Sequence, residues 1–448
     1  MKGKGFLRIT LVATMLFVAA IAGSAGEEYV PTAENLAARE QFTADRFGIF
    51  IHWGLYSMFG HGEWYQYKED IDFREYAKGA GAFYPAKFNA DKWVRFLKNC
   101  GARYITITSR HHEGFSMWDT AESDFKITNT PFGRDVLKEL SEACARKGMK
   151  LGFYYSHLDW HREDYPVGGH GKLLGRTPKP DWASYYSFMN NQLTELLTNY
   201  GRVNCIWFDG MWEHNADSVP FDWQVEAQYR LIHELQPQCL VINNHHEEVI
   251  AGEDVQTWER DLPGENRNGH AGMKMGLLPL ETATTMCDHD NWGYDLSEFG
   301  KFRSSKELIQ LLVRTAARDA NLLLNIGPRP DGEIPEEAMD RLEQMGQWLQ
   351  KNGVTIYGTR GGYLGDGENY VSTIKDNHIY VHFLKELSGK LVLEVGDKVK
   401  MISRLEDGGA IPFRQKKGKV TIEIGVPGDV VDYIVDIQIE PKNTGAKR

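Results

Sequence analysis

The sequence predicts an α/β fold, a (β/α)8 barrel of the TIM type, followed by a C-terminal antiparallel β-sandwich. Between about residues 47 and 350, short apolar runs alternate with longer segments of helical period, which is typical of parallel strands joined by helices. Eight strand candidates over this stretch match the strand number of such barrels and their usual length of roughly 250 residues. After residue 352 the helical period stops, and alternating stretches separated by Gly, Asp and Lys indicate the strands of a separate sandwich.

Each barrel strand is predicted from a short apolar run bounded by polar or turn residues. The eight runs are Gly48 to Trp53, Tyr104 to Ser109, Lys150 to Ser156, Val203 to Asp209, Leu240 to Asn244, Asp254 to Glu259, Glu281 to Met286 and Leu322 to Gly327. Helices are predicted between the strands where apolar residues recur at helical spacing. They cover about Asp91 to Cys100, Val136 to Lys147, Lys306 to Arg318, Glu336 to Lys351, and a segment in which Trp182, Tyr186, Met189, Leu193 and Leu196 form one apolar face.

The first 25 residues have the three parts of a secretory signal peptide. Basic residues precede an apolar run from Ile9 to Ala22, and small residues follow as far as Ala25. This run is short for a bilayer span, so a retained membrane anchor is the less favoured alternative. We expect a signal peptide (1–25), a catalytic barrel (26–352) and a β-sandwich domain (353–448). The protein is expected to be exported, periplasmic or secreted, with cleavage near Ala25 and no stable membrane insertion.

The composition excludes several classes of protein. With 42% hydrophobic and 25% charged residues, the chain can bury a large core, which excludes a disordered protein. A formal net charge of −11 argues against a nucleic-acid partner. The 12 Trp, 20 Tyr and 21 Phe residues exceed the needs of a core, and flat apolar rings suit sugars. The five cysteines form no Cys-x-x-Cys pair and are predicted to be small buried residues, although one disulfide stays open.

Asp209 is the sharpest catalytic candidate. The active site of a barrel forms at the carboxyl ends of its strands, and Asp209 ends an almost wholly apolar run, where a carboxylate is partly desolvated. Trp207, two residues earlier, points to the same side of the strand. An Asp before Gly is also a common turn residue, so a structural role is the alternative.

A carboxylate nucleophile needs a second carboxyl group to protonate the leaving oxygen, and in retaining glycosidases the two stand about 5–5.5 Å apart. Glu259 ends the sixth predicted strand and is the first candidate. Glu281 is the competitor, although it begins its strand, which would place it toward the floor of the barrel. The acid needs a raised pKa, which we expect from burial against Trp258 and from the proximity of Asp209.

The histidines at the strand ends allow a second hypothesis, a metal-dependent hydrolase that uses His52, His111 and His112. No His-Glu-x-x-His helix occurs, and two adjacent histidines cannot easily face one ion, so no metal ligand is predicted. Imidazoles at the rim can instead donate to a polyhydroxylated ligand. A third hypothesis is a carbohydrate-binding protein on a degenerate barrel. That protein would have lost a carboxylate, whereas both candidates are present.

Six long motifs lie in order between Arg46 and Tyr357: RFGIFIHWGLYS, GEWY, SRHHEGFSMWDT, GFYYSHLDW, CIWFDGMW and LLLNIGPRPDGEIP. Together they resemble the motifs of the α-L-fucosidases of glycoside hydrolase family 29. The resemblance implies a retaining exo-glycosidase that removes terminal α-L-fucose from oligosaccharides or glycoconjugates through a covalent glycosyl-enzyme. It also implies a barrel followed by a β-sandwich, and no cofactor.

The resemblance assigns roles to particular residues. Asp209 resembles the nucleophile, and Glu259 resembles the acid/base of several members, whereas other members use the later Glu that Glu281 resembles. The positions similar to fucose-binding residues are His52, Glu63, Trp64, His111, His112, Tyr154, Trp207 and Trp292, the last packing on the methyl face of the sugar.

One departure from the family pattern follows the fifth predicted strand. Many members have Arg-Trp after the Asn of this strand, whereas this chain reads Asn243-Asn244-His245-His246. Either Arg260 or His245 replaces the missing arginine, or the subsite differs, which leaves an α-L-galactoside as an alternative substrate.

Overall fold

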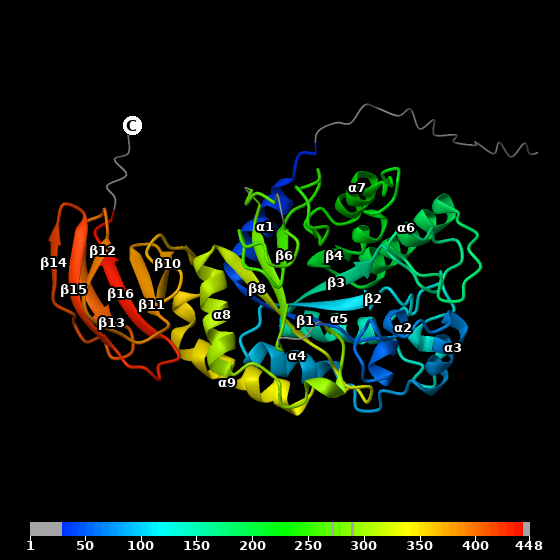
Figure 1. Ribbon diagram of the computed structural model, residues 1–448, viewed down its shortest axis with the longest axis horizontal. Coiled ribbons are helices and arrows are strands. Elements are labelled where there is room, and N and C mark those ends of the chain that lie inside the picture. Colours follow the sequence, from blue (N-terminus) through cyan, green and yellow to red (C-terminus); the bar gives the residue numbers. More distant parts are fainter. Residues whose placement is uncertain (1–28, 271–272, 277, 288–290, 442–448) are drawn as a thin grey trace, which may run out of the picture.

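The computed structural model describes residues 29–270, 273–276, 278–287 and 291–441 (Figure 1). The predicted signal peptide lies outside these residues. Eight parallel strands form one sheet in the order β5-β4-β3-β2-β1-β8-β7-β6, which curves into a nearly closed barrel. The predicted fold class is therefore confirmed. The strands are β1 (Phe47–Ile51), β2 (Tyr104–Arg110), β3 (Lys150–Ser156), β4 (Cys205–Asp209), β5 (Leu240–Asn243), β6 (Gln256–Glu259), β7 (Leu280–Thr285) and β8 (Ala320–Ile326).

The barrel closes at a seam between β5 and β6, which the described residues join by a single bridge from Ile242 to Val255. The buried carboxylate of Asp254 reinforces this seam. Its Oδ2 accepts a hydrogen bond from the backbone N–H of Val241 at 2.7 Å, and its Oδ1 pairs with Arg39 at 2.6 Å. A side chain thus supplies part of the bonding that a continuous ladder would provide.

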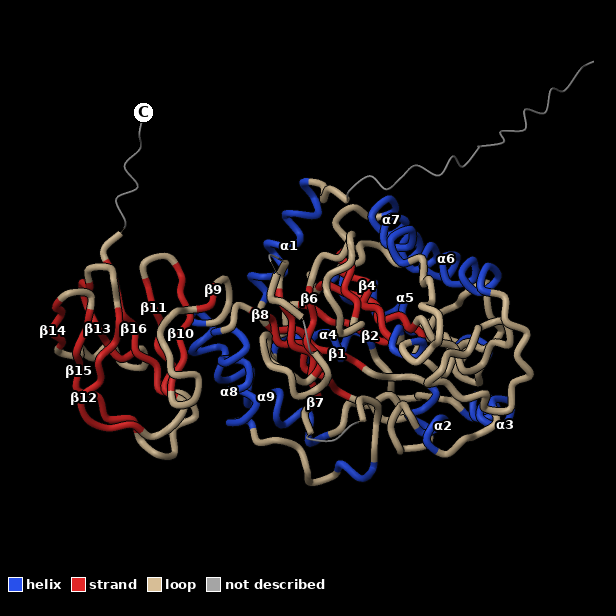
Figure 2. The backbone as a smooth tube through the Cα atoms, turned by 45° about the horizontal axis from the view of Figure 1, so that its top comes forward, coloured by secondary structure: helices blue, strands red, loops and turns tan. Residues whose placement is uncertain are grey.

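Helices surround the strands, as Figure 2 shows in blue and red. They are α1 (Ala33–Asp45), α2 (Tyr65–Lys68), α3 (Phe73–Ala77), α4 (Ala90–Asn99), α5 (Val136–Lys147), α6 (Trp182–Asn199), α7 (Val225–Leu235), α8 (Ser305–Ala317) and α9 (Glu336–Asn352). The prediction of eight complete strand-helix units is wrong in one respect. Within the described residues, the connections after β5 and after β6 contain no helix. After β6, Pro263, Gly264 and Gly269 are residues that disfavour a helix.

The floor of the barrel is packed by side chains that two glycines accommodate. A Cβ atom at Gly48 would lie 2.3 Å from the ring of Tyr104, and one at Gly152 would lie 2.3 Å from the sulfur of Cys205. Phe42 from α1, a helix that the sequence analysis missed, packs in the same interior cluster. These contacts fill the barrel below the site, so the carboxyl ends of the strands rest on a solid layer.

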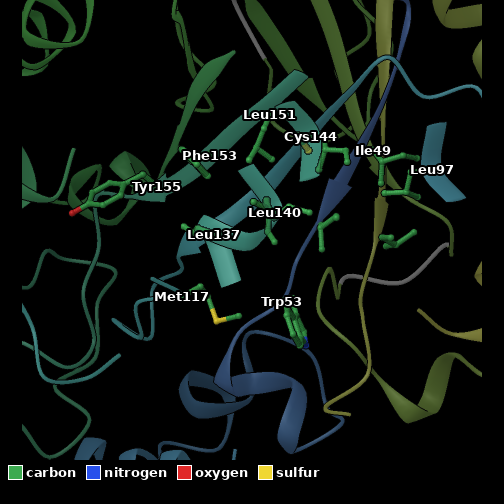
Figure 3. Packing of buried hydrophobic residues seen from close by; sticks show 14 of the residues in the cluster. Ile49, Trp53, Leu97, Met117, Leu137, Leu140, Cys144, Leu151, Phe153 and Tyr155 are labelled. Atoms are coloured by element: carbon green, nitrogen blue, oxygen red, sulfur yellow. The ribbon is translucent and has the colours of Figure 1, made fainter. Parts of the chain in front are cut away.

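A second core lies between the helices and the outer face of the sheet. Figure 3 shows part of it, with labelled residues from β1, α4, α5 and β3: Ile49, Leu97, Leu137, Leu140, Cys144, Leu151 and Phe153. All five cysteines lie within the described residues and are buried thiols outside any disulfide, as the spacing favoured. No helix in the described part of the chain has the length and apolar character needed to cross a membrane.

Two antiparallel sheets follow the barrel and enclose their own apolar core. Their strands are β9 (Arg360–Gly361), β10 (Tyr370–Lys375), β11 (His378–Phe383), β12 (Leu387–Glu394), β13 (Val399–Arg404), β14 (Phe413–Lys416), β15 (Lys419–Val426) and β16 (Tyr433–Ile439). Helix α8 lies between the barrel and these sheets (Figure 1). Gln310 on α8 donates to the backbone carbonyls of Leu384 and Val431 at 2.8 and 2.9 Å, which ties the two parts together.

We expect Gly48→Ala to destabilise the fold by about 1–3 kcal/mol, because its methyl group would overlap the buried ring of Tyr104. Urea unfolding measures this loss. The matched control is Gly81→Ala, whose methyl group would meet nothing within 4 Å. Equal stability of the two variants would contradict the tight packing of the barrel floor.

Candidate active site

A cavity of about 300 Å³ opens at the carboxyl ends of the barrel strands. Nine of the eleven residues predicted for the site line it: His52, Trp64, His111, His112, Tyr154, Trp207, Asp209, Glu259 and Trp292. They come from six different strands or from the loops that follow them. The other two predicted residues, Glu63 and Glu281, are fully buried and do not line the cavity.

Asp209 is the last residue of β4, and both of its carboxylate oxygens are held. Oδ2 accepts a hydrogen bond from the hydroxyl of Tyr154 at 2.9 Å, and Oδ1 accepts one from the backbone N–H of Gly210 at 2.8 Å. Gly210 has a φ of 105°, a conformation that favours glycine and turns the chain so that its N–H faces the carboxylate. The side chain remains 16% exposed, so it is oriented but accessible from the cavity.

Glu259 is the last residue of β6 and faces the same cavity. The side-chain amide of Asn244 donates to its Oε2 at 2.8 Å and also reaches Oδ1 of Asp209 at 3.5 Å. Nε2 of His246 lies 3.5 Å from Oε2 of Glu259, and Nε of Arg260 lies 3.8 Å from Oε1. The two acids therefore share one amide donor, while the basic side chains gather around Glu259.

These surroundings shift the two carboxyl groups in opposite directions. Burial, and then the negative charge of Glu259, raise the pKa of Asp209 to about 7. Burial also acts to raise the pKa of Glu259, but the hydrogen bond and charge of His246, with Asn244 and Arg260, outweigh it and lower that pKa to about 2. The raised pKa expected for Glu259 is therefore wrong. That prediction considered burial against Trp258, which raises the pKa, but not the hydrogen bond and charge of the His246 imidazole, which lower it.

Three buried histidines form one wall of the cavity. Nδ1 of His52 is hydrogen-bonded to Asn325 at 2.7 Å, and Nδ1 of His112 to the hydroxyl of Ser156 at 2.6 Å. Burial lowers the pKa of His52 and of His112 to about 3, and that of His111 well below its usual value. All three rings are therefore neutral near pH 7. His52 and His112 each keep one ring nitrogen, Nε2, for a hydrogen bond with a hydroxyl group, because Nδ1 is already bonded within the protein.

The hypothesis of a metal-dependent hydrolase requires a ligand set. In the part of the chain that the structure describes, no group of three or more His, Cys, Asp or Glu side chains is arranged to hold a metal ion. His52 and His112 instead use one ring nitrogen each for a hydrogen bond to a neighbouring side chain.

Aromatic rings form the other walls. Tyr154 and Trp207 stack with ring centroids 5.7 Å apart, and Trp292 lies 5.1 Å from the ring of His52. Glu63 holds the segment that carries Trp292, because its Oε2 accepts from the backbone N–H groups of Trp292 and Gly293, both at 2.7 Å. Glu63, a position predicted to bind sugar, does not line the cavity and instead holds the backbone beside one of the rings that do.

Glu281 lies one layer lower in the barrel than Glu259. In the register of β6 and β7 it pairs with Thr257, two residues before Glu259. Side chains two residues apart on a strand point to the same side, so Glu281 faces the interior toward the floor, as its place in the strand predicts. Its carboxylate accepts hydrogen bonds from Trp207 and Tyr104 and is fully buried.

Asn244, His246 and the ring of Trp212 also line the cavity, although the sequence did not predict them as site residues. The sequence shows two Asn and two His in a row at the end of β5, but the backbone conformation decides which of these side chains turn toward the cavity. His246 has a φ of 63°, whereas His245 is held by Glu253 at 2.7 Å.

This chain lacks the arginine that many family members carry after the fifth strand. Instead, the basic side chains of His246 and Arg260 lie near Glu259. His245, the other candidate from the sequence, also lines the cavity.

Comparisons with known proteins show the family to which this chain belongs. Residues 16–354 match the model of the family described as Alpha-L-fucosidase. The chain belongs to the α-L-fucosidase family, glycoside hydrolase family 29. The plasma α-L-fucosidase of Rattus norvegicus is 32% identical over 401 residues, which cover 82% of this chain and 82% of that relative. The plasma enzyme of Homo sapiens is 30% identical over 407 residues, which cover 81% of this chain and 80% of that relative.

Solved structures of α-L-fucosidases also resemble this fucosidase. Isoenzyme 1 from Paenibacillus thiaminolyticus superimposes with a TM-score of 0.79 at 31% identity, covering 91% of this chain and 100% of that one. The Thermotoga maritima α-fucosidase in complex with a mechanism-based inhibitor superimposes with a TM-score of 0.73 at 26% identity, covering 92% and 100%. The family resemblance and the enzyme class inferred from the motifs are thereby confirmed.

We expect His246→Gln to shift the alkaline limb of the kcat/KM profile for an aryl α-L-fucoside to higher pH. The positive charge of His246 lowers the pKa of both Glu259 and Asp209, so its removal raises both, and the pair loses its proton at a higher pH. Initial rates between pH 4 and pH 9 measure the limb. His378→Gln, in the C-terminal sheets, is the matched control. A limb that stays in place or moves to lower pH would contradict the role given to His246.

Proposed function

We propose that this fucosidase hydrolyses terminal α-L-fucosides with retention of configuration, with Asp209 as nucleophile and Glu259 as acid/base. The spacing of the two acids is the supporting observation. One nitrogen, Asn244 Nδ2, lies 3.5 Å from Oδ1 of Asp209 and 2.8 Å from Oε2 of Glu259. The separation of these two oxygens therefore cannot exceed the sum of the two distances. That limit is compatible with the roughly 5–5.5 Å that separates the two carboxyl groups of retaining glycosidases.

The reaction proceeds in two displacements. Asp209 attacks the anomeric carbon while Glu259 gives its proton to the glycosidic oxygen, so that bond breaks and a fucosyl-enzyme forms. Glu259 then takes a proton from water, which attacks the same carbon and releases Asp209. Tyr154 and the N–H of Gly210 orient the nucleophile for both steps. The Thermotoga maritima relative, captured with a mechanism-based inhibitor, supports a covalent route.

The first step needs a proton on Glu259 and none on Asp209, the reverse of the order that their pKa values favour. Burial acts to lower the pKa of His246, but its contact with Glu259 and the neighbouring carboxylates raise it overall, so this imidazole can carry a proton 3.5 Å from Oε2 of Glu259. A glycosidic oxygen that approaches Glu259 excludes water from it, which raises its pKa.

Protonation of Glu259 removes the negative charge that holds up the pKa of Asp209. The nucleophile therefore ionises as the acid gains its proton, and the pair acts as one coupled unit.

The walls of the cavity suit a deoxy sugar. Neutral imidazoles of His52, His111 and His112 can bind ring hydroxyls, while the indole of Trp292, by family resemblance, packs on the apolar methyl face. The substrate class is a terminal α-L-fucoside of an oligosaccharide or glycoconjugate. An α-L-galactoside, which adds a hydroxyl on that methyl carbon, would set a polar group against the indole and is expected to react more slowly.

We expect Asp209→Ala to lose most activity on nitrophenyl α-L-fucoside, by about 10⁴-fold or more, because no nucleophile remains. Azide should restore turnover by occupying the space of the carboxylate and should yield the fucosyl azide of inverted configuration. Product analysis by NMR identifies the anomer. Full activity of Asp209→Ala would end the proposal.

Glu259→Ala is the companion variant. It should retain activity on an activated aryl fucoside better than on one with a poor leaving group, and azide should give the retained product. Parallel assays with nitrophenyl α-L-galactoside and with a chelator test the alternatives. Faster hydrolysis of the galactoside than of the fucoside would favour an α-L-galactosidase. Activity that is lost with the chelator and restored by zinc would favour a metal-dependent hydrolase.

We further propose that the protein is exported after removal of residues 1–25. The basic, apolar and small-residue parts of this segment support the proposal, as does the description of the rat and human relatives as plasma enzymes. The mass of the mature protein recovered from the expressing cells tests it, since an intact N-terminus would contradict cleavage near Ala25.

A further inference from the structure

Glu281 joins strands that are far apart in the barrel. It lies on β7, and its Oε1 accepts a hydrogen bond from the indole Nε1 of Trp207 on β4 at 3.0 Å. Its Oε2 accepts one from the hydroxyl of Tyr104 on β2 at 2.9 Å. The carboxylate has no exposed surface, so these bonds cross the closed interior. A buried acid that receives two side-chain donors in this way fixes the positions of both.

The indole held by Glu281 reaches the nucleophile in two further contacts. Trp207 lines the cavity and stacks on the ring of Tyr154, with centroids 5.7 Å apart and planes 22° apart. The hydroxyl of Tyr154 donates to Oδ2 of Asp209 at 2.9 Å. A change in the orientation of the indole would therefore alter both the wall of the cavity and the support of the nucleophile.

The packing around Tyr104 leaves little room for this arrangement to relax. The ring of Tyr104 fills the space where Gly48 has no side chain. The indole of Trp207 is itself buried, so without an acceptor its N–H would stay unsatisfied, which disfavours this orientation of the ring. Glu281 is the acceptor that the structure provides for it.

We propose that Glu281 is a positioning residue of the fucosidase reaction, which acts by orienting the indole of Trp207 from beneath the cavity and, through Tyr154, the carboxylate of Asp209. This inference rests on the proposed function. It gives Glu281 a role other than that of acid/base, because Glu281 contacts the wall of the cavity from behind, whereas Glu259 lines the cavity itself.

Two substitutions separate hydrogen bonding from charge. In Glu281→Gln, the amide oxygen can accept from Trp207 and the amide nitrogen can donate to the oxygen of Tyr104. In Glu281→Leu, both partners lose their acceptor. We expect Glu281→Leu to lower kcat/KM by about 10- to 100-fold, as a misplaced site does. Glu281→Gln should recover activity to within about fivefold of the parent enzyme, because a neutral acceptor still binds the indole.

The leaving group distinguishes positioning from acid catalysis. If Glu281 positions Trp207, the loss in Glu281→Leu is the same for aryl fucosides with good and poor leaving groups, and azide gives no fucosyl azide. If Glu281→Gln is as inactive as Glu281→Leu, and azide and an activated leaving group restore turnover in both, Glu281 is the acid/base and the inference is overturned. Wild-type kinetics in Glu281→Leu, with only a lower melting temperature, would overturn it as well.

A double-mutant cycle tests the route through the indole. Trp207→Phe removes the N–H donor, so adding Glu281→Leu to it should cause little further loss of kcat/KM, and additive losses would contradict the route. Tyr104→Phe is the control, because it removes the other donor to Glu281 and leaves the bond to Trp207. The azide products of Asp209→Ala and Glu259→Ala decide the proposed function separately, so its failure can be told from that of this inference.

Discussion

Two carboxyl groups in one buried cavity are the constraint around which this structure is organised. Burial opposes the ionisation of each, and the charge of either one opposes ionisation of the other. The structure resolves this conflict by giving the two acids different partners. Asp209 receives neutral donors, from Tyr154 and the backbone of Gly210. Glu259 receives the basic groups His246 and Arg260. Their unequal surroundings separate the two pKa values, so the pair can hold a single proton near neutral pH.

The rigidity that this arrangement needs comes from below the cavity. A barrel interior is a stack of side-chain layers, and the layer under the site is filled from strands that are not neighbours. Gly48 makes room for the ring of Tyr104, and Gly152 for the sulfur of Cys205. At the seam between β5 and β6, where the strands share a single bridge, the side chain of Asp254 accepts a hydrogen bond from the backbone N–H of Val241. The site therefore rests on packing that its own residues do not supply.

Much of the fold could be predicted because its signals are local. The eight strands were found within a few residues of their observed bounds, since each is a short apolar run between turns. Helix α1 was missed because its segment, AENLAAREQFTAD, contains few large apolar residues. A helix was also predicted after each of the eight strands, on the strand count alone. Within the described residues, the connections after β5 and after β6 contain no helix.

The sequence alone determined most of the residues that were predicted for the site and that line the cavity. The alternation of a strand places Trp207 and Asp209 on one side, and the end of an apolar run places Asp209 at the mouth of the barrel. The tertiary structure alone decided that Glu281 lies a layer below Glu259, that His246 turns toward Glu259, and that Asn244 spans both acids. The reason is physical. Alternation is a property of one strand, whereas the height of a side chain depends on the stagger between strands, and the direction of a loop residue depends on contacts distant in sequence.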